Sequence, residues 1–145
     1  MNSTEEQLER LRGITIIKPG GDWSYNFMVS AWSKSFKKSL YAGVIPNHLY
    51  HSVMKEMIDG LIARGMLSLV ICNKDNQDQI LGFIAFEVEN KYILHYIYTK
   101  YAVRGLGFAK LLTQAAKLPN NYIYTHKTRH SKPEQSFKPE YARKK

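Results

Sequence analysis

The spacing of apolar residues changes several times along the chain, and each change marks the end of an expected element. A β-branched run at 14–18, closed by Pro-Gly-Gly, predicts a first strand and a turn. Between 23 and 40 the apolar residues recur at helical spacing, which predicts a helix; they are Tyr25, Met28, Val29, Trp32 and Phe36. A second helix is expected from Pro46, a favoured first helical residue, to Gly65, the residue type that commonly ends helices.

From residue 68 onward the spacing is that of strands. We expect a buried strand at 68–72, two long strands at 80–88 and 92–99 joined by a tight hairpin, and a short strand at 122–125. The two long strands are apolar on both faces, which is typical of central strands covered by helices on each side. A helix is predicted for 106–118, between the fourth and fifth strands.

The predicted order β-α-α-β-β-β-α-β indicates an α/β fold with a mixed sheet between helices. Three consecutive strands are joined by hairpins, and a helical crossover then leads from the fourth strand to the fifth. We expect one domain at 1–125, because a chain of 145 residues is long enough for a single core. Residues 126–145 have little apolar content beyond Phe137 and Tyr141, so they are expected to form a basic tail or an edge strand.

The composition is that of an ordinary globular protein, with 44% hydrophobic and 23% charged residues. The first thirteen residues are polar and carry three Glu, which excludes a secretory signal there, and no apolar run approaches the length of a membrane span. Cys72 is the single cysteine, so an internal disulfide or a thiolate metal cluster is excluded, and its apolar neighbours favour a core position over a nucleophile. We expect a cytoplasmic protein with no membrane partner.

The net charge of +9 is unevenly distributed. Residues 126–145 hold seven Lys or Arg against two Glu. A basic surface attracts polyanions, including a cofactor with several phosphates, an acidic protein or RNA. A loose basic tail that only adds solubility is equally consistent with this charge.

The stretch 96–112 carries the clearest chemical signal. A buried strand ends, a short loop follows, and a helix begins with Gly105 and Gly107 among its expected first positions. The first N–H groups of a helix have no intrahelical partner and carry a partial positive charge, so they can bind a diphosphate. The two glycines lack the Cβ that would hold a phosphate away, and Arg104 adds a formal charge.

Three phosphate-binding motifs compete for this loop. A Rossmann fingerprint needs a third glycine where Lys110 stands, and it needs a strand near the start of a βαβ unit rather than at the end of a meander. A P-loop needs Gly-Lys-Ser/Thr, which is absent. The pattern R-x-x-G-x-[GA] matches, as Arg104, Gly107 and Ala109.

On these residues the chain resembles the GNAT superfamily of acyl-CoA N-acyltransferases over roughly 14–125. The six-residue motif follows a hydrophobic strand, precedes Leu111-Leu112 in a helix, and has Ile80-Leu81-Gly82-Phe83-Ile84 on the preceding strand. The resemblance implies a GNAT-like mixed β-sheet flanked by helices and splayed between strands 4 and 5, here shortened at the C-terminus. Compact chains of this kind also resemble small proteins of tailed phages, which would place the protein in the host cytoplasm.

The resemblance implies acetyl-CoA (CoA) as co-substrate and also implies where it binds. The loop and first helical turn would hold the pyrophosphate through Arg104, Gly105, Leu106, Gly107, Phe108 and Ala109. The end of the fourth strand would pair with the pantetheine arm and supply an N–H that polarises the thioester carbonyl, through Ile97, Tyr98 or Thr99.

His95 is the first candidate for the general base, because some family members carry a catalytic His nine residues before the Arg of the motif. An unperturbed pKa of ~6.5 suits a base near neutral pH. The alternative is a His satisfied inside the sheet. Glu87 and Glu89 are further candidates for the base, or solvated hairpin charges. Tyr124, with His126 beside it, lies near where the family places its general acid. However, no helix is predicted after Thr125, so neither residue can be matched to the general acid of the family.

The function indicated is N-acetyl transfer from acetyl-CoA to an amine, without a metal. The shortened acceptor side and the basic tail favour a macromolecular amine, on a protein or associated with RNA or the ribosome. The alternative is a catalytically inactive GNAT-fold protein that binds CoA or a host partner protein. A third hypothesis is a nucleic-acid binder that stacks bases on Tyr92, Tyr96 and Tyr98, if these side chains are exposed.

Overall fold

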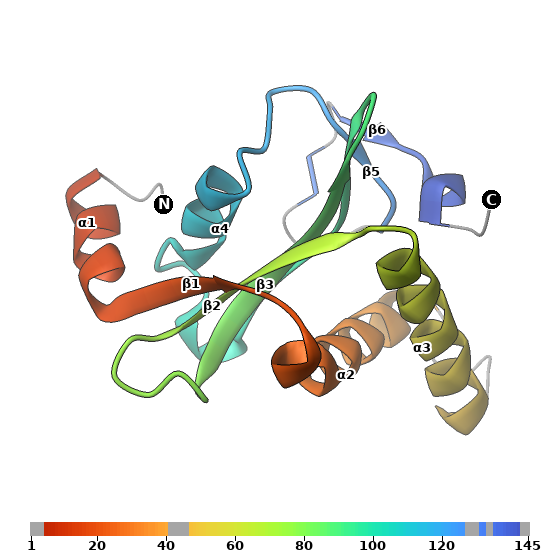
Figure 1. Ribbon diagram of the computed structural model, residues 1–145, viewed down its shortest axis with the longest axis horizontal. Coiled ribbons are helices and arrows are strands. Elements are labelled where there is room, and N and C mark those ends of the chain that lie inside the picture. The colour runs from red at the N-terminus through yellow and green to blue at the C-terminus, as the bar shows by residue number, and fades with distance from the viewer. Residues whose placement is uncertain (1–4, 41–46, 127–130, 133–134, 143–145) are drawn as a thin grey trace.

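A six-stranded sheet organises the computed structural model, which describes residues 5–40, 47–126, 131–132 and 135–142 (Figure 1). The strands lie in the order of the sequence, β1-β2-β3-β4-β5-β6. The elements are α1 (Glu5–Ile14), β1 (Thr15–Pro19), α2 (Asp22–Leu40), α3 (Asn47–Ala63), β2 (Leu67–Asn73), β3 (Ile80–Val88), β4 (Tyr92–Thr99), the 3-10 turn η1 (Tyr101–Val103), α4 (Phe108–Ala115), β5 (Ile123–Tyr124), β6 (Ser136–Phe137) and the 3-10 turn η2 (Pro139–Ala142).

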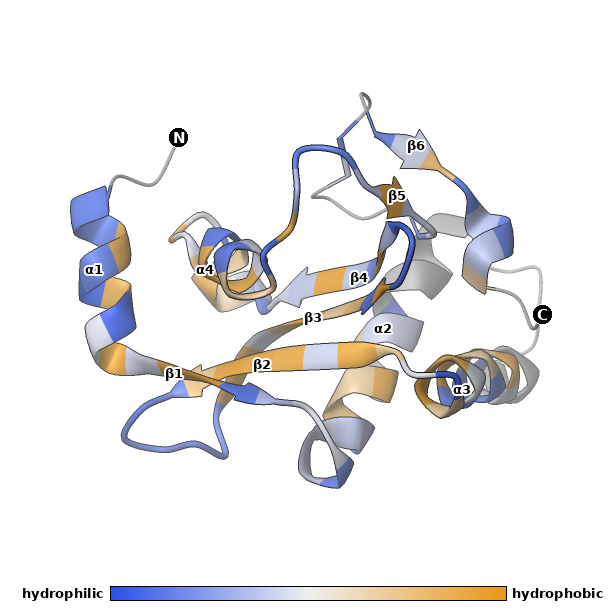
Figure 2. Cartoon of the chain, turned by 45° about the horizontal axis from the view of Figure 1, so that its top comes forward, coloured by the Kyte–Doolittle hydropathy of each residue, from blue (hydrophilic) through white to orange (hydrophobic). Residues whose placement is uncertain are grey.

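The sheet is mixed, as predicted. Strands β1 to β4 are antiparallel neighbours, whereas β4 pairs with β5 in parallel and β5 pairs with β6 in parallel. Helix α4 provides the crossover that a parallel connection requires. Helices α2 and α3 cover one face of the sheet, and α1 and α4 cover the other (Figures 1 and 2).

Two apolar layers form the core, one on each face of the sheet. Trp32 and Ile58 pack against Phe83 on the α2/α3 face. Leu112 packs with Ile84 on the α4 face. Strand β3 is buried from Ile80 to Glu87, which confirms the prediction of a central strand covered on both sides. Cys72 is buried too, as expected for a core residue.

Helix α1 was not predicted, because the first thirteen residues are polar on average. Its Leu8 is fully buried and belongs to the α4-side core, and Arg12 Nη2 donates to Gln114 Oε1 on α4 at 2.8 Å. The available signal was local: Leu8 and Leu11 are spaced by three, and two Glu stand in the first turn, where negative charge suits the helix dipole. One buried leucine, Leu8, and one partly buried leucine, Leu11, therefore attach a mostly polar helix.

A β-bulge interrupts β4 at His95. Tyr96 lies opposite Ala85 and Leu94 lies opposite Phe86, so His95 is the extra residue of the strand. Side chains that regular alternation would place on one face are therefore divided between the two. Tyr92 stacks on Phe86 on the α4 side with ring centroids 5.5 Å apart; Tyr96 stacks on Trp32 on the α2 side at 5.0 Å.

These positions argue against base stacking on the tyrosines of β4. Tyr96 is only 3% exposed, and Tyr98 packs against the core beside it. Tyr92, on the opposite face, donates its hydroxyl to the Ala116 carbonyl at 2.8 Å. The three rings fill the core rather than form an exposed platform, so the nucleic-acid hypothesis loses the feature that it depended on.

Part of the expected C-terminal tail is an edge strand. Ser136 and Phe137 form β6 beside β5, the Lys138 amide donates to the Tyr124 carbonyl at 2.9 Å, and the Phe137 and Tyr124 rings lie 5.2 Å apart. The basic residues Lys127, Arg129 and 143–145 lie outside the described residues. Within the described part of the chain, every helix is too short or too polar to cross a membrane.

Candidate active site

The predicted phosphate-binding loop connects β4 to α4, but the helix begins two residues later than expected. Gly105 and Gly107 have φ angles of 82° and 111°. Positive φ is incompatible with a right-handed helix and is the conformation that glycine tolerates best. Both glycines therefore belong to the loop: Gly107 caps the helix, and α4 starts at Phe108.

The start of α4 presents the donors that a diphosphate needs. The Leu111 amide donates to the Gly107 carbonyl at 3.1 Å, so the N–H groups of the three preceding residues point out of the helix end. The Phe108 side chain is buried and anchors this turn, while Arg104 and Leu106 are exposed. The Arg104 guanidinium lies 5.2 Å from the Tyr101 ring centroid, at the loop surface. The loop combines free amides, open backbone and a cation, which fits an anionic ligand.

Strands β4 and β5 separate immediately after the bulge. Their pairing ends at Leu94 opposite Tyr124, followed by a bond from the Thr125 amide to the Leu94 carbonyl at 3.2 Å. A gap therefore opens beside the second half of β4. This is the splay that the GNAT resemblance implied.

The register of β4 determines which backbone groups face this gap. The Lys100 amide donates to the Leu81 carbonyl at 2.9 Å, so these two residues form a hydrogen-bonded pair. Such pairs alternate along an antiparallel ladder, which makes Phe83 and Tyr98 the next one. Ile97 and Thr99 therefore direct their N–H and C=O groups away from β3, whereas the backbone of Tyr98 is engaged with β3.

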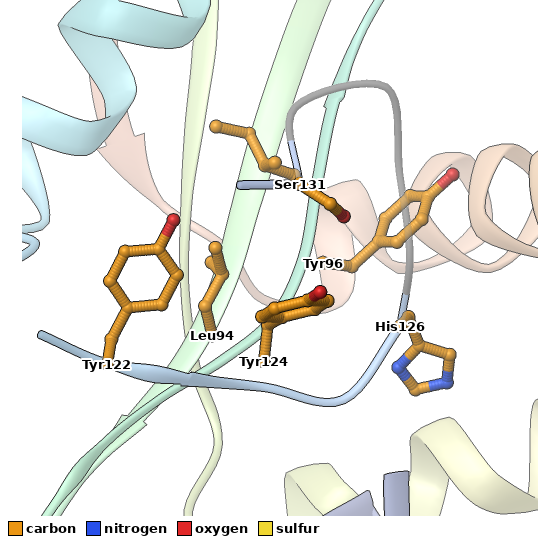
Figure 3. A pocket seen from close by; sticks show the side chains of 7 residues that line it. Leu94, Tyr96, Tyr122, Tyr124, His126 and Ser131 are labelled. Atoms are coloured by element: carbon orange, nitrogen blue, oxygen red, sulfur yellow. The ribbon is translucent and has the colours of Figure 1, made fainter. Parts of the chain in front are cut away.

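A small cavity of about 10 Å³ lies in the gap (Figure 3). This volume is about that of one water-sized probe. It is lined by Leu94, Tyr96, Ile97, Tyr122, Tyr124, His126 and Ser131. Tyr124 and His126, the two residues considered for proton transfer near the fifth strand, both line this cavity and are both buried, and the His126 ring lies edge-on to the Trp32 ring of α2 at 5.2 Å.

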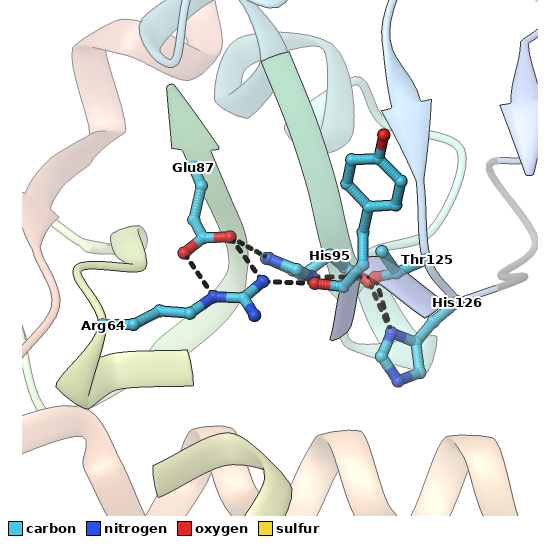
Figure 4. A network of polar contacts seen from close by, with 6 residues as sticks. Arg64, Glu87, His95, Thr125 and His126 are labelled. Carbon is cyan, nitrogen blue, oxygen red and sulfur yellow. Dashed lines mark hydrogen bonds and ion pairs between the residues drawn. The ribbon is translucent and has the colours of Figure 1, made fainter. Parts of the chain in front are cut away.

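A buried polar network begins at the bulge (Figure 4). His95 is fully buried, and both of its ring nitrogens are engaged. Nε2 lies 2.8 Å from Glu87 Oε2, and Nδ1 lies 2.8 Å from Thr125 Oγ1. His126 Nδ1 continues the series at 2.9 Å from Thr125 Oγ1 and 3.1 Å from the His95 carbonyl. Two of the predicted site residues, His95 and Glu87, are thus in direct contact.

Arg64 closes the other end of the network. Its Nε and Nη2 atoms each donate to a different oxygen of Glu87 at 2.8 Å, and Nη2 also donates to the Tyr141 carbonyl. Arg64 lies where α3 ends in a Schellman pattern: Met66 N bonds to Leu61 O, and Gly65 N bonds to Ile62 O with Gly65 at φ 109°. A forked guanidinium-carboxylate pair is a strong and directional contact.

The network holds its groups in defined protonation states. Burial would raise the pKa of Glu87, but hydrogen bonds from Arg64 and His95 outweigh it and lower that pKa below its usual value. Burial lowers the pKa of His95, against the opposing effect of Glu87. Burial also lowers the pKa of His126 to about 4. Near neutral pH the network therefore contains two neutral imidazoles and one carboxylate.

The remaining predicted residue, Glu89, stands apart from the network. It is exposed at the β3–β4 hairpin and lines an open cavity of about 430 Å³, together with Arg64, Glu87, Asn90, Lys91, Ile93, Glu140 and Tyr141. Sequence reasoning missed Arg64 and Thr125. The only signal for Arg64 was its place before Gly65, and Thr125 was visible only as the end of a strand.

No protein-family model matches this sequence, and a comparison with curated protein sequences finds no match. Solved structures do match. A candidate acetyl transferase from Pyrococcus furiosus has a TM-score of 0.59 at 16% identity, over 82% of this chain and 85% of that one. A GNAT family acetyltransferase from Brucella melitensis, in complex with acetyl-CoA, has a TM-score of 0.53 at 20% identity, over 71% and 66%.

A third similar structure is a ribosomal-protein-alanine N-acetyltransferase from Brucella melitensis biovar Abortus 2308. Its TM-score is 0.52 at 16% identity, over 71% of this chain and 69% of that one. These likenesses show that the chain has the fold of the GNAT superfamily, as the loop motif and the order of elements predicted. These three proteins come from cellular organisms, so they give no support to the resemblance to phage proteins.

Proposed function

We propose that this chain binds acetyl-CoA and transfers its acetyl group to an amine. The observation that carries the proposal is the arrangement along β4. The loop that carries the Arg104, Gly107 and Ala109 motif follows the strand directly, and the outward-facing backbone of Ile97 and Thr99 leads from that loop into the β4–β5 gap. A similar structure of the same fold contains acetyl-CoA, which matches this combination of an anionic end and an extended arm.

The loop and the strand would bind different parts of the ligand. The N–H groups at the start of α4 and the Arg104 side chain suit the pyrophosphate. The backbone of Thr99 and Ile97 offers the pantetheine arm the pairing that a fifth strand would otherwise take. The thioester would then lie deepest in the gap, beside His126 and the bulge.

The chemistry follows from this placement. A neutral amine attacks the thioester carbonyl carbon, the C–S bond breaks, and the thiolate of CoA leaves. Negative charge develops on the carbonyl oxygen during attack, and the Ile97 N–H is directed to stabilise it. An ammonium must first lose a proton. His126 lines the gap and is joined through Thr125 to the buried pair His95–Glu87, so these groups are the candidates to accept that proton.

The acceptor proposed is a primary amine on a macromolecule, such as a protein N-terminus or a lysine. One structural neighbour is named as an enzyme that acts on a ribosomal protein, which supports a protein amine in this fold. The high positive charge of residues 126–145 would favour an acidic or RNA-associated partner. The expected boundary at residue 125 and the cytoplasmic location stay predictions.

Calorimetry with a charge reversal tests the binding step. Lys110 is exposed in the first turn of α4. Lys110→Glu places a carboxylate where it favours the helix but repels a diphosphate, so the fold should persist while acetyl-CoA affinity falls by about tenfold or more. Lys91→Glu, at the opposite end of β4, is the matched control and should bind as the parent does. Equal affinity in parent, Lys110→Glu and control would contradict the site.

Transfer is tested separately, by mass spectrometry of peptides with free N-termini and of ribosomal proteins incubated with the chain and acetyl-CoA. A mass gain of one acetyl group that requires both components is expected. A second candidate function, CoA binding without transfer, is favoured by the small volume of the gap, about 10 Å³. Tight acetyl-CoA binding without any acetylated amine would select this second function.

A further inference from the structure

The cavity in the β4–β5 gap is small, and its walls are buried (Figure 3). Its volume of about 10 Å³ is that of one water-sized probe, and a methyl group is only slightly larger than a water molecule. Six of its seven lining residues are no more than 8% exposed; they are Leu94, Tyr96, Ile97, Tyr122, Tyr124 and His126. The cavity therefore has room for a single small group.

The backbone of β4 indicates which group that is. Ile97 lines the cavity and also directs its N–H into the gap, away from β3. A pantetheine arm that comes from the loop passes Thr99 first, so its sulfur lies on the Thr99 side when the thioester carbonyl accepts from the Ile97 N–H. The acyl chain then continues in the other direction, toward Leu94 and Tyr124, where the two strands pair and the gap ends. The cavity lies at that end, since both of these residues line it.

Other side chains support the walls of the cavity from behind. Tyr96 stacks on the fully buried Trp32 with ring centroids 5.0 Å apart. The Tyr124 ring lies 5.2 Å from the ring of Phe137 on β6. Leu94 packs in the α4-side core. A wall that moved outward would displace a packed neighbour, and protein interiors have little free volume for such a movement.

We propose that this cavity holds the methyl group of the thioester and that Leu94 and Ile97 restrict the acyl group to acetyl. This inference rests on the proposed acetyl transfer, and it specifies which acyl-CoA the site accepts. The two side chains are the aliphatic part of the wall, so a methyl group placed between them is removed from water. Propionyl and butyryl groups are longer by one and two methylenes, which the cavity can take in only if a wall is displaced.

This selection acts on the acyl donor and not on the acceptor amine. The loop and the strand bind the CoA part that every acyl-CoA shares, so differences in affinity along an acyl series come from the cavity. One extra methylene in an apolar pocket changes binding or rate by about 10- to 200-fold. The affinity difference between acetyl-CoA and propionyl-CoA thus measures how strongly the walls resist displacement.

Calorimetry of the intact chain with CoA, acetyl-CoA, propionyl-CoA and butyryl-CoA tests the proposal without any turnover. Propionyl-CoA is expected to bind about tenfold or more weakly than acetyl-CoA, and butyryl-CoA more weakly still. CoA lacks the acyl group and reports on the loop and the strand alone. Equal affinity for the three thioesters overturns the acyl pocket and leaves acetyl-CoA binding in place, because the cavity would then hold water instead of the chain. If none of the four binds, the proposed function is overturned as well.

Two small substitutions test the walls directly. Leu94→Val and Ile97→Val each remove one carbon from a lining side chain, which is among the smaller changes that a core can undergo. In both variants the preference for acetyl-CoA over propionyl-CoA should shrink by about threefold or more, because the cavity gains room for part of a methylene. The affinity for CoA should stay that of the parent, which shows that the fold and the loop are intact.

Ile84→Val is the matched control for these variants. Ile84 lies opposite Ile97 on β3 and packs in the same core, but it stands outside the cavity lining. It loses the same carbon as Ile97→Val, so its preference for acetyl-CoA should equal that of the parent. An unchanged preference in both Leu94→Val and Ile97→Val, or an equal change in Ile84→Val, overturns the proposal.

Discussion

His95 Nε2 lies 2.8 Å from Glu87 Oε2, although Glu87 is paired in the sheet with Ile93 and not with His95. The two side chains are diagonal neighbours on one face, and the bulge keeps His95 on that face while Leu94 faces α4. This contact places a carboxylate and an imidazole next to the point where β4 and β5 separate. It also makes Glu87 a buried member of the site, whereas the sequence had equally suggested a solvated hairpin charge.

The contact predicts how activity depends on pH. Because burial lowers the pKa of His95 and of His126, the acid limb of the kcat profile should lie below pH 6.5. An unperturbed histidine, with a pKa of ~6.5, would place this limb near neutral pH. In His95→Gln, kcat should fall by about 10²-fold and the acid limb should change shape, while acetyl-CoA affinity stays the same. A lower melting temperature with an unaltered pH profile would mean that His95 only supports the fold.

Arg64 should stabilise the protein through Glu87. In Arg64→Met the carboxylate stays buried next to His95 but loses its forked partner, so the free energy of unfolding should fall by roughly 3 kcal/mol at pH 7. The pKa of Glu87 should rise, because the hydrogen bond that lowers it most is removed. Denaturant titrations measure the first effect.

Glu87→Gln in the Arg64→Met background provides the control for this pair. It removes the uncompensated charge, so it should recover part of the lost stability. If Arg64→Met alone costs less than about 1 kcal/mol, the pair does not contribute as a buried ion pair.

Much of the fold was predictable because its signals are local. The period of α2 and α3, the doubly apolar β3 and the loop motif at Arg104 each lie within one short stretch of sequence. The structure has the two helices and the strand as expected, and it has the loop between β4 and α4, with α4 beginning two residues later than predicted. Helix α1 was missed because a single buried face of Leu8 and Leu11 has too little apolar content to stand out among charges.

The missing parts of the site depend on contacts that are distant in the sequence. Arg64 and Glu87 are 23 residues apart, and His95 and Thr125 are 30 apart. The contacts of His95 depend on the bulge, and a bulge of one residue leaves no mark in a strand that is apolar on both faces. The register of β4 therefore had to be observed before the network could be traced.

The C-terminal strand predicts a loss of stability on truncation. Removal of residues 127–145 deletes the β5–β6 pairing, the bond from Lys138 to Tyr124 and the carbonyl that accepts from Arg64. The free energy of unfolding should fall by about 1–3 kcal/mol, as expected for a few hydrogen bonds and a ring contact. Acetyl-CoA affinity should change little, since the loop at 104–109 lies outside the deleted segment. An unchanged melting temperature would mean that β6 adds nothing to the fold.

Arg104 should contribute one charge-assisted contact to acetyl-CoA binding. Arg104→Ala is expected to weaken binding by roughly 1–2 kcal/mol and to reduce its dependence on salt concentration. The side chain is exposed and its described contact is with the Tyr101 ring, so the fold should be unaffected. Tyr101→Leu removes that ring and keeps the charge, and it should cost much less. Calorimetry at two salt concentrations compares the three proteins, and equal affinities would remove Arg104 from the site.

His126 should make the stability of the protein depend on pH in the range where histidines titrate. Burial holds its pKa at about 4, whereas an unfolded chain binds the proton near 6.5. Between these values the unfolded state carries more protons than the folded state, so the free energy of unfolding decreases as the pH falls, by roughly 3 kcal/mol in total. Above pH 6.5 this contribution is fully present.

His95, with a pKa lowered in the same way, adds a further loss of stability in the same direction, and Glu87 contributes only below its usual pKa. Denaturant titrations between pH 5 and 7 should therefore show a positive slope, and His126→Gln, which stays neutral at every pH, should flatten it. A parent protein equally stable at pH 5 and pH 7 would mean that the ring of His126 reaches solvent and would contradict its buried position.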